Sequence, residues 1–447
     1  MNKHVHVWST LLSAMAILFA PMVVAAASNP LYPPGIGFNP AVDYTKANFS
    51  QSPNIRKFVD KLPGLGAANA NGLGQYIPVA TPDTTSYPGS DYYEIGMKQF
   101  TLQMHSDLPA TTKLRGYYWK GADPSAQYLG VAIIAKRYDP TKPAGVGSNG
   151  KPVRLKVFNE LGKGTLGNLP IPVDETIMGA GMGPGTAKFN HNRSTIHLHG
   201  GLTPWISDGT PHQWITPAGD TVAAAGGAAY QKGAAFQNVP DMVNGSTVNG
   251  VAVPCIGTGG KCFTPAANDG IGTYYYTNQQ SARLMFYHDH AWGTTRINVY
   301  AGMAAPYLLY DQFEEDMIAG TNVAGANPTN AKLLPDQSTV VQGAGGAVAG
   351  GGVYRYGIPL VIQDKSFVND ANVPLAAAKN VFPAAVTGYK HTPSTQSTDP
   401  LWYTYVNAQI TPSSTAGGDL WFPHEYMPVE NPFDPSGNTP NGRWDYA

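Results

Sequence analysis

The chain of 447 residues is poor in charge, with Asp, Glu, Lys and Arg together making up 13% of it. That is about half the share found in an ordinary soluble protein. The formal net charge is −1, so the chain lacks the excess of positive charge with which proteins bind nucleic acid or anionic membranes. We therefore expect neither of these as a partner.

A membrane-spanning run is also lacking. The apolar stretch LLSAMAILFAPMVV near the N-terminus has about 14 residues, too few to span a bilayer comfortably. It follows Lys3 and precedes VAAA, whose small residues suit signal peptidase. We predict a signal peptide over residues 1–27, a periplasmic or secreted protein, and no membrane attachment after cleavage. An uncleaved anchor is the alternative.

Cysteine is nearly absent. Cys255 and Cys262 are the two examples, in PCIGTGGKCF. In an exported protein, two cysteines that flank a Gly-rich turn most often form a local disulfide. We predict that bond here, with free thiols and metal ligands as the alternatives.

Turn-forming residues and tyrosine are abundant, with Gly 51, Pro 38 and Tyr 25. This composition fits an all-β protein with long loops better than a helical one. Strand patterns occur at 92–105, 128–138 and 153–161. In the last of these, VRLKVFNEL, residues alternate between two faces, which is typical of a β-sandwich.

The composition changes along the chain and suggests a domain order. Residues 54–63 (NIRKFVDKLP) and 312–320 (QFEEDMIAG) have helical character, and YGIPLVIQDKSF (356–367) has that of a strand. VQGAGGAVAGGGV reads as a flexible linker. After the signal peptide we predict an N-terminal strap over 28–90, domain 1 over 91–311 with an insertion at about 220–282, a Gly-rich linker over 312–353, and a partial domain 2 over 354–447.

Two histidine pairs stand out, because the chain has only 11 histidines. STIHLHGG contains His197 and His199, and LMFYHDHAW contains His288 and His290. In a strand, residues i and i+2 point to the same face about 6.5–7 Å apart. Four imidazoles that converge from two such strands, without a carboxylate, favour copper or zinc. Solvent-facing polar pairs are the alternative.

At greater length the two segments become recognisable. HLHGGLTPWISDG and YHDHAWGTTRINVYAGMAAPYLLYD resemble the first and second copper motifs of multicopper oxidases, in the branch of bacterial spore-coat laccases and bilirubin oxidases. The resemblance implies cupredoxin-like β-sandwich domains, here one complete and a second truncated, and copper at type 2 and type 3 sites.

The same resemblance implies individual roles. His197 would bind the type 2 copper, His199 and His288 one type 3 copper, and His290 the other. Asp208 matches an acidic residue that assists proton delivery, while a turn residue before Gly209 is its alternative reading. The expected reaction oxidises phenolic, pigment or metal-ion substrates and reduces dioxygen to water.

The family's remaining copper motifs have no counterpart in this sequence. Cys255 precedes Ile and Cys262 precedes Phe, so neither forms the Cys-His element of a type 1 site. We therefore expect the chain to correspond to the N-terminal part of such an oxidase, supplying half of the trinuclear ligands, inactive alone and in need of a further cupredoxin domain. The rival interpretation is a non-catalytic exported copper-binding protein that uses the same four histidines.

Overall fold

The computed structural model describes residues 56–108, 111–171, 173, 177–184, 188–221, 230–334, 360–367 and 418–421. The signal peptide predicted over residues 1–27 lies outside the described residues, as does most of the partial domain predicted over 354–447.

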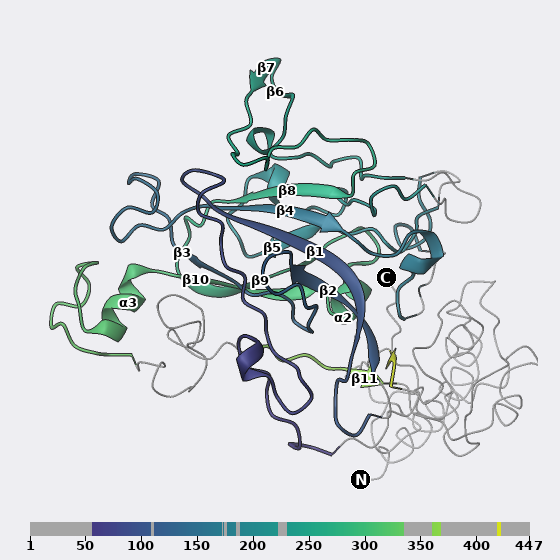
Figure 1. Ribbon diagram of the computed structural model, residues 1–447, viewed down its shortest axis with the longest axis horizontal. Coiled ribbons are helices and arrows are strands. Elements are labelled where there is room, and N and C mark those ends of the chain that lie inside the picture. The colour runs from purple at the N-terminus through teal and green to yellow at the C-terminus, as the bar shows by residue number, and fades with distance from the viewer. Residues whose placement is uncertain are drawn as a thin grey trace, which may run out of the picture. The chain divides into compact units, whose positions relative to one another are not determined.

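Two four-stranded sheets form the body of the described chain (Figure 1). The first sheet has the order β2-β1-β4-β8, built from β2 (Thr112–Trp119), β1 (Asp91–Leu102), β4 (Val153–Asn159) and β8 (Ile271–Tyr276). The second sheet has the order β3-β10-β9-β5, built from β3 (Ile133–Lys136), β10 (Ala304–Tyr310), β9 (Arg283–Asp289) and β5 (Ile196–His199). The β1–β4 and β3–β10 pairs are parallel and the remaining pairs antiparallel.

The core lies between the two sheets, because alternate residues of each strand point inward. Ile95 of β1, Val157 of β4 and Tyr287 of β9 are fully buried members of one apolar cluster to which both sheets contribute. The prediction of an all-β protein with a cupredoxin-like sandwich is confirmed by this packing.

Helices are short and lie at the ends of strands. α2 (Thr295–Tyr300) follows β9, and α3 (Gln312–Ala319) follows β10. The Asp311 side chain caps α3 by accepting a hydrogen bond from the Glu314 amide, and Gly320 ends it with a φ of 72°. The helix predicted in QFEEDMIAG is thus confirmed. None of the helices in the described ranges has the length and apolar character of a membrane span. Single 3-10 turns occupy Ala67–Asn69, Gly164–Gly167, Trp205–Ser207 and Pro240–Met242.

The structure corrects two sequence predictions, one in the N-terminal strap and one in the insertion. Residues 56–63, expected to be helical, contain no helix. Phe58 and Leu62 there are 101% and 77% exposed, so an apolar face that packing would stabilise is missing. The insertion expected at 220–282 contains β8, which is a core strand, so the stretch that leaves the sheets ends before Ile271.

Outside the sandwich, β6 (Ser246–Val248) and β7 (Val251–Val253) form a hairpin. Cys255 and Cys262, next to it, are joined by a disulfide with their Cα atoms 6.1 Å apart. β11 (Ser366–Phe367) pairs with β12 (Leu420–Trp421). Of the strand expected over 356–367, residues 366–367 form β11 and residues 360–365 are not in a strand, while 356–359 lie outside the described residues.

Candidate metal centre

The two histidine motifs lie on neighbouring antiparallel strands of the second sheet, where His197 of β5 pairs with His288 of β9. Ile196 and Leu198 enter the core, so His197 and His199 face outward. Tyr287 likewise enters the core and His288 faces outward. His290 lies one residue beyond the end of β9.

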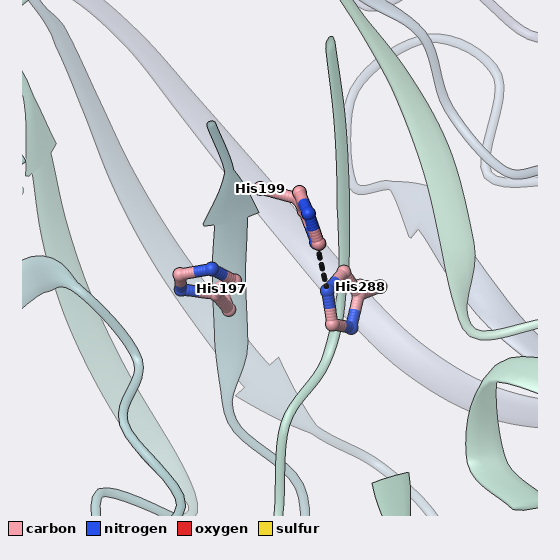
Figure 2. A group of neighbouring side chains, drawn as sticks. All are labelled: His197, His199 and His288. Atoms are coloured by element: carbon pink, nitrogen blue, oxygen red, sulfur yellow. Dashed lines mark hydrogen bonds between the residues drawn. The ribbon is translucent and has the colours of Figure 1, made fainter. Parts of the chain in front are cut away.

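The four imidazoles converge. One nitrogen from each of His197, His199 and His288 lies within 4.8 Å of the other two (Figure 2). His199 Nδ1 and His288 Nε2 face each other at 3.2 Å. The His290 ring centroid is 4.8 Å from that of His197 and 5.6 Å from that of His288. The structure thus brings together all four residues that the sequence singled out.

Backbone carbonyls select the tautomer of two of these rings. His197 Nδ1 lies 2.6 Å from the carbonyl oxygen of Asp208, and His288 Nδ1 lies 2.6 Å from that of Asp289. A carbonyl only accepts, so each Nδ1 carries the proton and donates it. The lone pair then resides on Nε2. This is the usual arrangement of a metal-binding histidine, whose other ring nitrogen donates a hydrogen bond that orients the ring.

The electrostatic surroundings favour neutral rings. Burial lowers the pKa of His288 to about 4, and repulsion from His197 and the other histidines adds to this. Burial also lowers the pKa of His290 below its usual range. Neutral imidazoles with available lone pairs are what a transition metal requires.

Asp208 lies beside His197, as a residue of the turn that follows β5. Its carboxylate Oδ1 is 3.6 Å from His197 Nδ1 and accepts a hydrogen bond of 3.0 Å from Thr203 Oγ1. The side chain is 39% exposed. Gly209, next in the chain, has a φ of +69° and passes so close to β5 that an added Cβ would lie 1.8 Å from the Ile196 carbonyl oxygen. The turn therefore holds Asp208 against the histidines.

An aromatic side chain supports the cluster on the outer face. The Phe286 ring stacks on His199 at 4.7 Å and on His288 at 5.3 Å between centroids. Phe286 is 41% exposed and Leu284, two residues before it on the same face, is 42% exposed. The histidines thus lie on a partly apolar, solvent-accessible face of the second sheet.

Three other histidines lie within the described residues, and one of them, His191, is buried. His105 packs near Asp60, with 3.4 Å between Nε2 and the carboxylate, and His212 packs on Trp292 at 4.9 Å between ring centroids. His391 and His424 lie outside the described residues.

Sequence reasoning missed the buried polar residues behind the centre. Asp289, between the two histidines of HDH, is fully buried and accepts hydrogen bonds from Ser194 and Asn298. An acidic residue between two outward-facing histidines must point into the interior, and that parity was the signal available in the sequence.

Comparisons with known proteins find sequence relatives of this chain among laccases and multicopper oxidases. No family model matches the chain. It is 29% identical to a laccase of Bacillus stratosphericus over 317 residues, 71% of this chain and 39% of the relative. It is 27% identical to a laccase of Bacillus subtilis over 58% of this chain and 35% of the relative. The multicopper oxidase LPR1 of Arabidopsis thaliana is 30% identical over 57% of this chain and 31% of its own length.

Among solved structures, a laccase from Pediococcus acidilactici matches with a TM-score of 0.30 and 16% identity, over 61% of this chain and 37% of that one. The chain spans between 31% and 39% of the length of the three sequence relatives named above.

Proposed function

Because the chain is related to laccases and other multicopper oxidases over part of their length, we propose that its sandwich domain binds copper through the four clustered histidines. The convergence of His197, His199 and His288, with nitrogens within 4.8 Å of one another, is the observation that carries this proposal (Figure 2).

The donor set fits copper. Imidazole nitrogens without a carboxylate suit copper or zinc, and the relationship to multicopper oxidases favours copper. His199 and His288 are the proposed ligands of one type 3 copper, which is supported by the 3.2 Å between their facing nitrogens. We assign His197 to a type 2 copper and His290 to the second type 3 copper.

When bound, copper ions in such a centre supply the one-electron redox chemistry that reduces dioxygen to water. The surrounding residues hold and orient the ligands. The Asp208 carbonyl fixes the His197 ring, and the Asp208 carboxylate, which reaches solvent, is the proposed carrier of protons to the centre. Phe286 stacks on His199 and His288 and restricts the orientations that their rings can take.

The complete reaction requires ligands that these residues do not provide. A type 1 site needs a thiolate with two imidazoles, and Cys255 and Cys262 are bonded to each other. The chain supplies half of the trinuclear ligands in this proposal, and a further cupredoxin domain supplies the rest. The reducing substrate of the whole oxidase is a phenol, a pigment or a metal ion. The 447 residues alone are inactive.

The second candidate function is that of an exported copper-binding protein without turnover. The same four histidines serve it, and the absence of a free cysteine among the described residues favours it over catalysis by this chain alone.

Electron paramagnetic resonance of the full chain with one equivalent of Cu(II) tests the proposal. Hyperfine coupling to imidazole nitrogens, lost in His197→Ala/His288→Ala, is the expected result. The same spectrum in both proteins would contradict it. Oxygen uptake with a phenolic substrate, measured beside His288→Ala, then separates the two functions. Uptake that the substitution abolishes would refute the inactivity of the chain alone.

A further inference from the structure

The residue between His288 and His290 faces away from the metal centre. Asp289 is the last residue of β9 and the cross-strand partner of Ile196, whose side chain is in the core. Asp289 has no exposed surface. A buried carboxylate is costly unless its oxygens accept hydrogen bonds.

Four donors surround this carboxylate. Oδ1 accepts from Ser194 Oγ at 2.7 Å and from the Thr195 amide at 3.2 Å. Oδ2 accepts from the Ala291 amide at 3.1 Å and from Asn298 Nδ2 at 2.9 Å. Each oxygen therefore accepts two hydrogen bonds, which is the full capacity of a carboxylate. The four bonds hold the carboxylate in one orientation.

The donors belong to both histidine motifs. Ser194 and Thr195 lead into β5, directly before the segment that carries His197. Ala291 follows His290. The His290 amide adds a direct link by donating to the Thr195 carbonyl at 3.2 Å. The buried Asp289 carboxylate is thus hydrogen-bonded to both of the segments whose histidines converge on the outer face of the sheet.

The fourth donor is itself held in place. Asn298 lies on α2, and its Oδ1 accepts from Arg115 Nη1 at 2.8 Å. Because Arg115 only donates, the amide of Asn298 must turn its Nδ2 toward Asp289. Arg115 is fully buried and also donates to the His191 carbonyl at 2.8 Å. The network therefore extends from the carboxylate into the core.

We propose that Asp289 is a positioning residue for the metal centre, which sets the distance between the His197–His199 segment and the His288–His290 segment through its four hydrogen bonds. This inference rests on the proposed function, because it assigns to the network the task of arranging copper ligands.

The substitution Asp289→Asn tests the network with little change in shape. All four neighbours donate, so the NH₂ group of an asparagine would face donors and leave at least one of them without an acceptor. The expected result is a loss of Cu(II) affinity of about 10- to 100-fold, which is the usual effect of disturbing the residues that orient metal ligands.

Asp316→Asn is the matched control. Asp316 is also buried without exposed surface and accepts from three donors, Gln312, Thr321 and Ala324, but it lies on α3 rather than beside a histidine. Asp316→Asn should lower thermal stability and leave Cu(II) affinity within about twofold of the wild type, since the hydrogen bonds of Asp316 reach neither segment that carries the proposed ligands. Equal losses of affinity in the two variants would overturn the proposal.

Hydrogen–deuterium exchange of the metal-free full chain gives a second readout that needs no copper. Peptides covering residues 192–199 and 286–293 should exchange faster in Asp289→Asn than in the wild type, and at the wild-type rate in Asp316→Asn. Unchanged exchange in Asp289→Asn would overturn the proposal even if the wild type bound no copper, whereas a wild type without copper would refute the proposed function alone. If Asp289→Asn does not fold, Ser194→Ala removes one of the four bonds, and it should show the same changes to a smaller degree.

Discussion

His197 and His288 are direct cross-strand partners, with ring centroids 5.5 Å apart. The register of the hydrogen-bonded ladder of β5 and β9 therefore places these two histidines opposite each other. A shift of the register by one residue would turn the histidines of one strand toward the core and its apolar residues outward. A centre built on paired strands is more rigid than one built on loops.

Phe286→Ala should weaken Cu(II) binding, because the ring stacks on both His199 and His288. A stacking contact contributes about 0.5–1.5 kcal/mol, which corresponds to roughly a two- to tenfold loss of affinity. Isothermal titration with Cu(II) measures the change. Leu284→Ala is the control, because Leu284 is equally exposed on the same face. An equal loss of affinity in the control would show that the stacked ring has no special role.

Gly209→Ala should destabilise the domain strongly. The substitution combines a φ of +69° with a Cβ placed 1.8 Å from the Ile196 carbonyl oxygen, so the turn that carries Asp208 must move away from β5. We expect a loss of more than about 3 kcal/mol, measured by denaturant unfolding.

Gly200→Ala provides the comparison for this turn. Gly200 also has a positive φ, +80°, but no atom lies within 4 Å of an added Cβ. The cost should be that of the left-handed conformation alone, about 1–2 kcal/mol. If the two variants were equally stable, close approach to β5 would not be the reason for glycine at 209.

Asp316 should make stability depend on pH in the acidic range. Burial opposes its ionisation, but hydrogen bonds from Ala324, Thr321 and Gln312 outweigh this and lower the pKa from 3.8 to about 2. A depressed pKa in the folded state stabilises the protein above the unfolded value. This contribution is complete above about pH 4 to 5 and is lost as the pH falls toward 2. Thermal unfolding between pH 6 and 2 should show a steeper fall for the wild type than for Asp316→Asn. Parallel curves would contradict the assignment.

The histidine centre was predictable because its information is local. The alternation of Ile196, His197, Leu198 and His199 states which side chains share a face, and the same alternation surrounds His288. The sandwich followed from similar alternation in β4. Gly-, Ala- and Asn-rich sequence precedes β8 and made this strand look like part of the insertion, although Tyr274 and Tyr276 pack in the core.

The buried network was not predictable in the same way. Arg115 occupies the interior of β2, where a charged residue breaks the expected pattern. Its partners are the carbonyls of Gly167 and His191 and the side chain of Asn298, which lie 52, 76 and 183 residues away. Such bonds leave no periodic signal. The helix expected around Phe58 is not formed for a related reason. Phe58 and Leu62 are exposed, so the tertiary contacts that would stabilise a helix there are missing.

Equilibrium dialysis of the full chain against Cu(II), with bound copper measured by atomic absorption, tests the central claim most directly. His197→Ala/His288→Ala is compared with His105→Ala/His212→Ala, which removes two histidines that lie outside the cluster. We predict tightly bound copper in the wild type and in the control, and its loss in the variant that lacks the cross-strand pair. Equal copper in all three proteins would contradict the account.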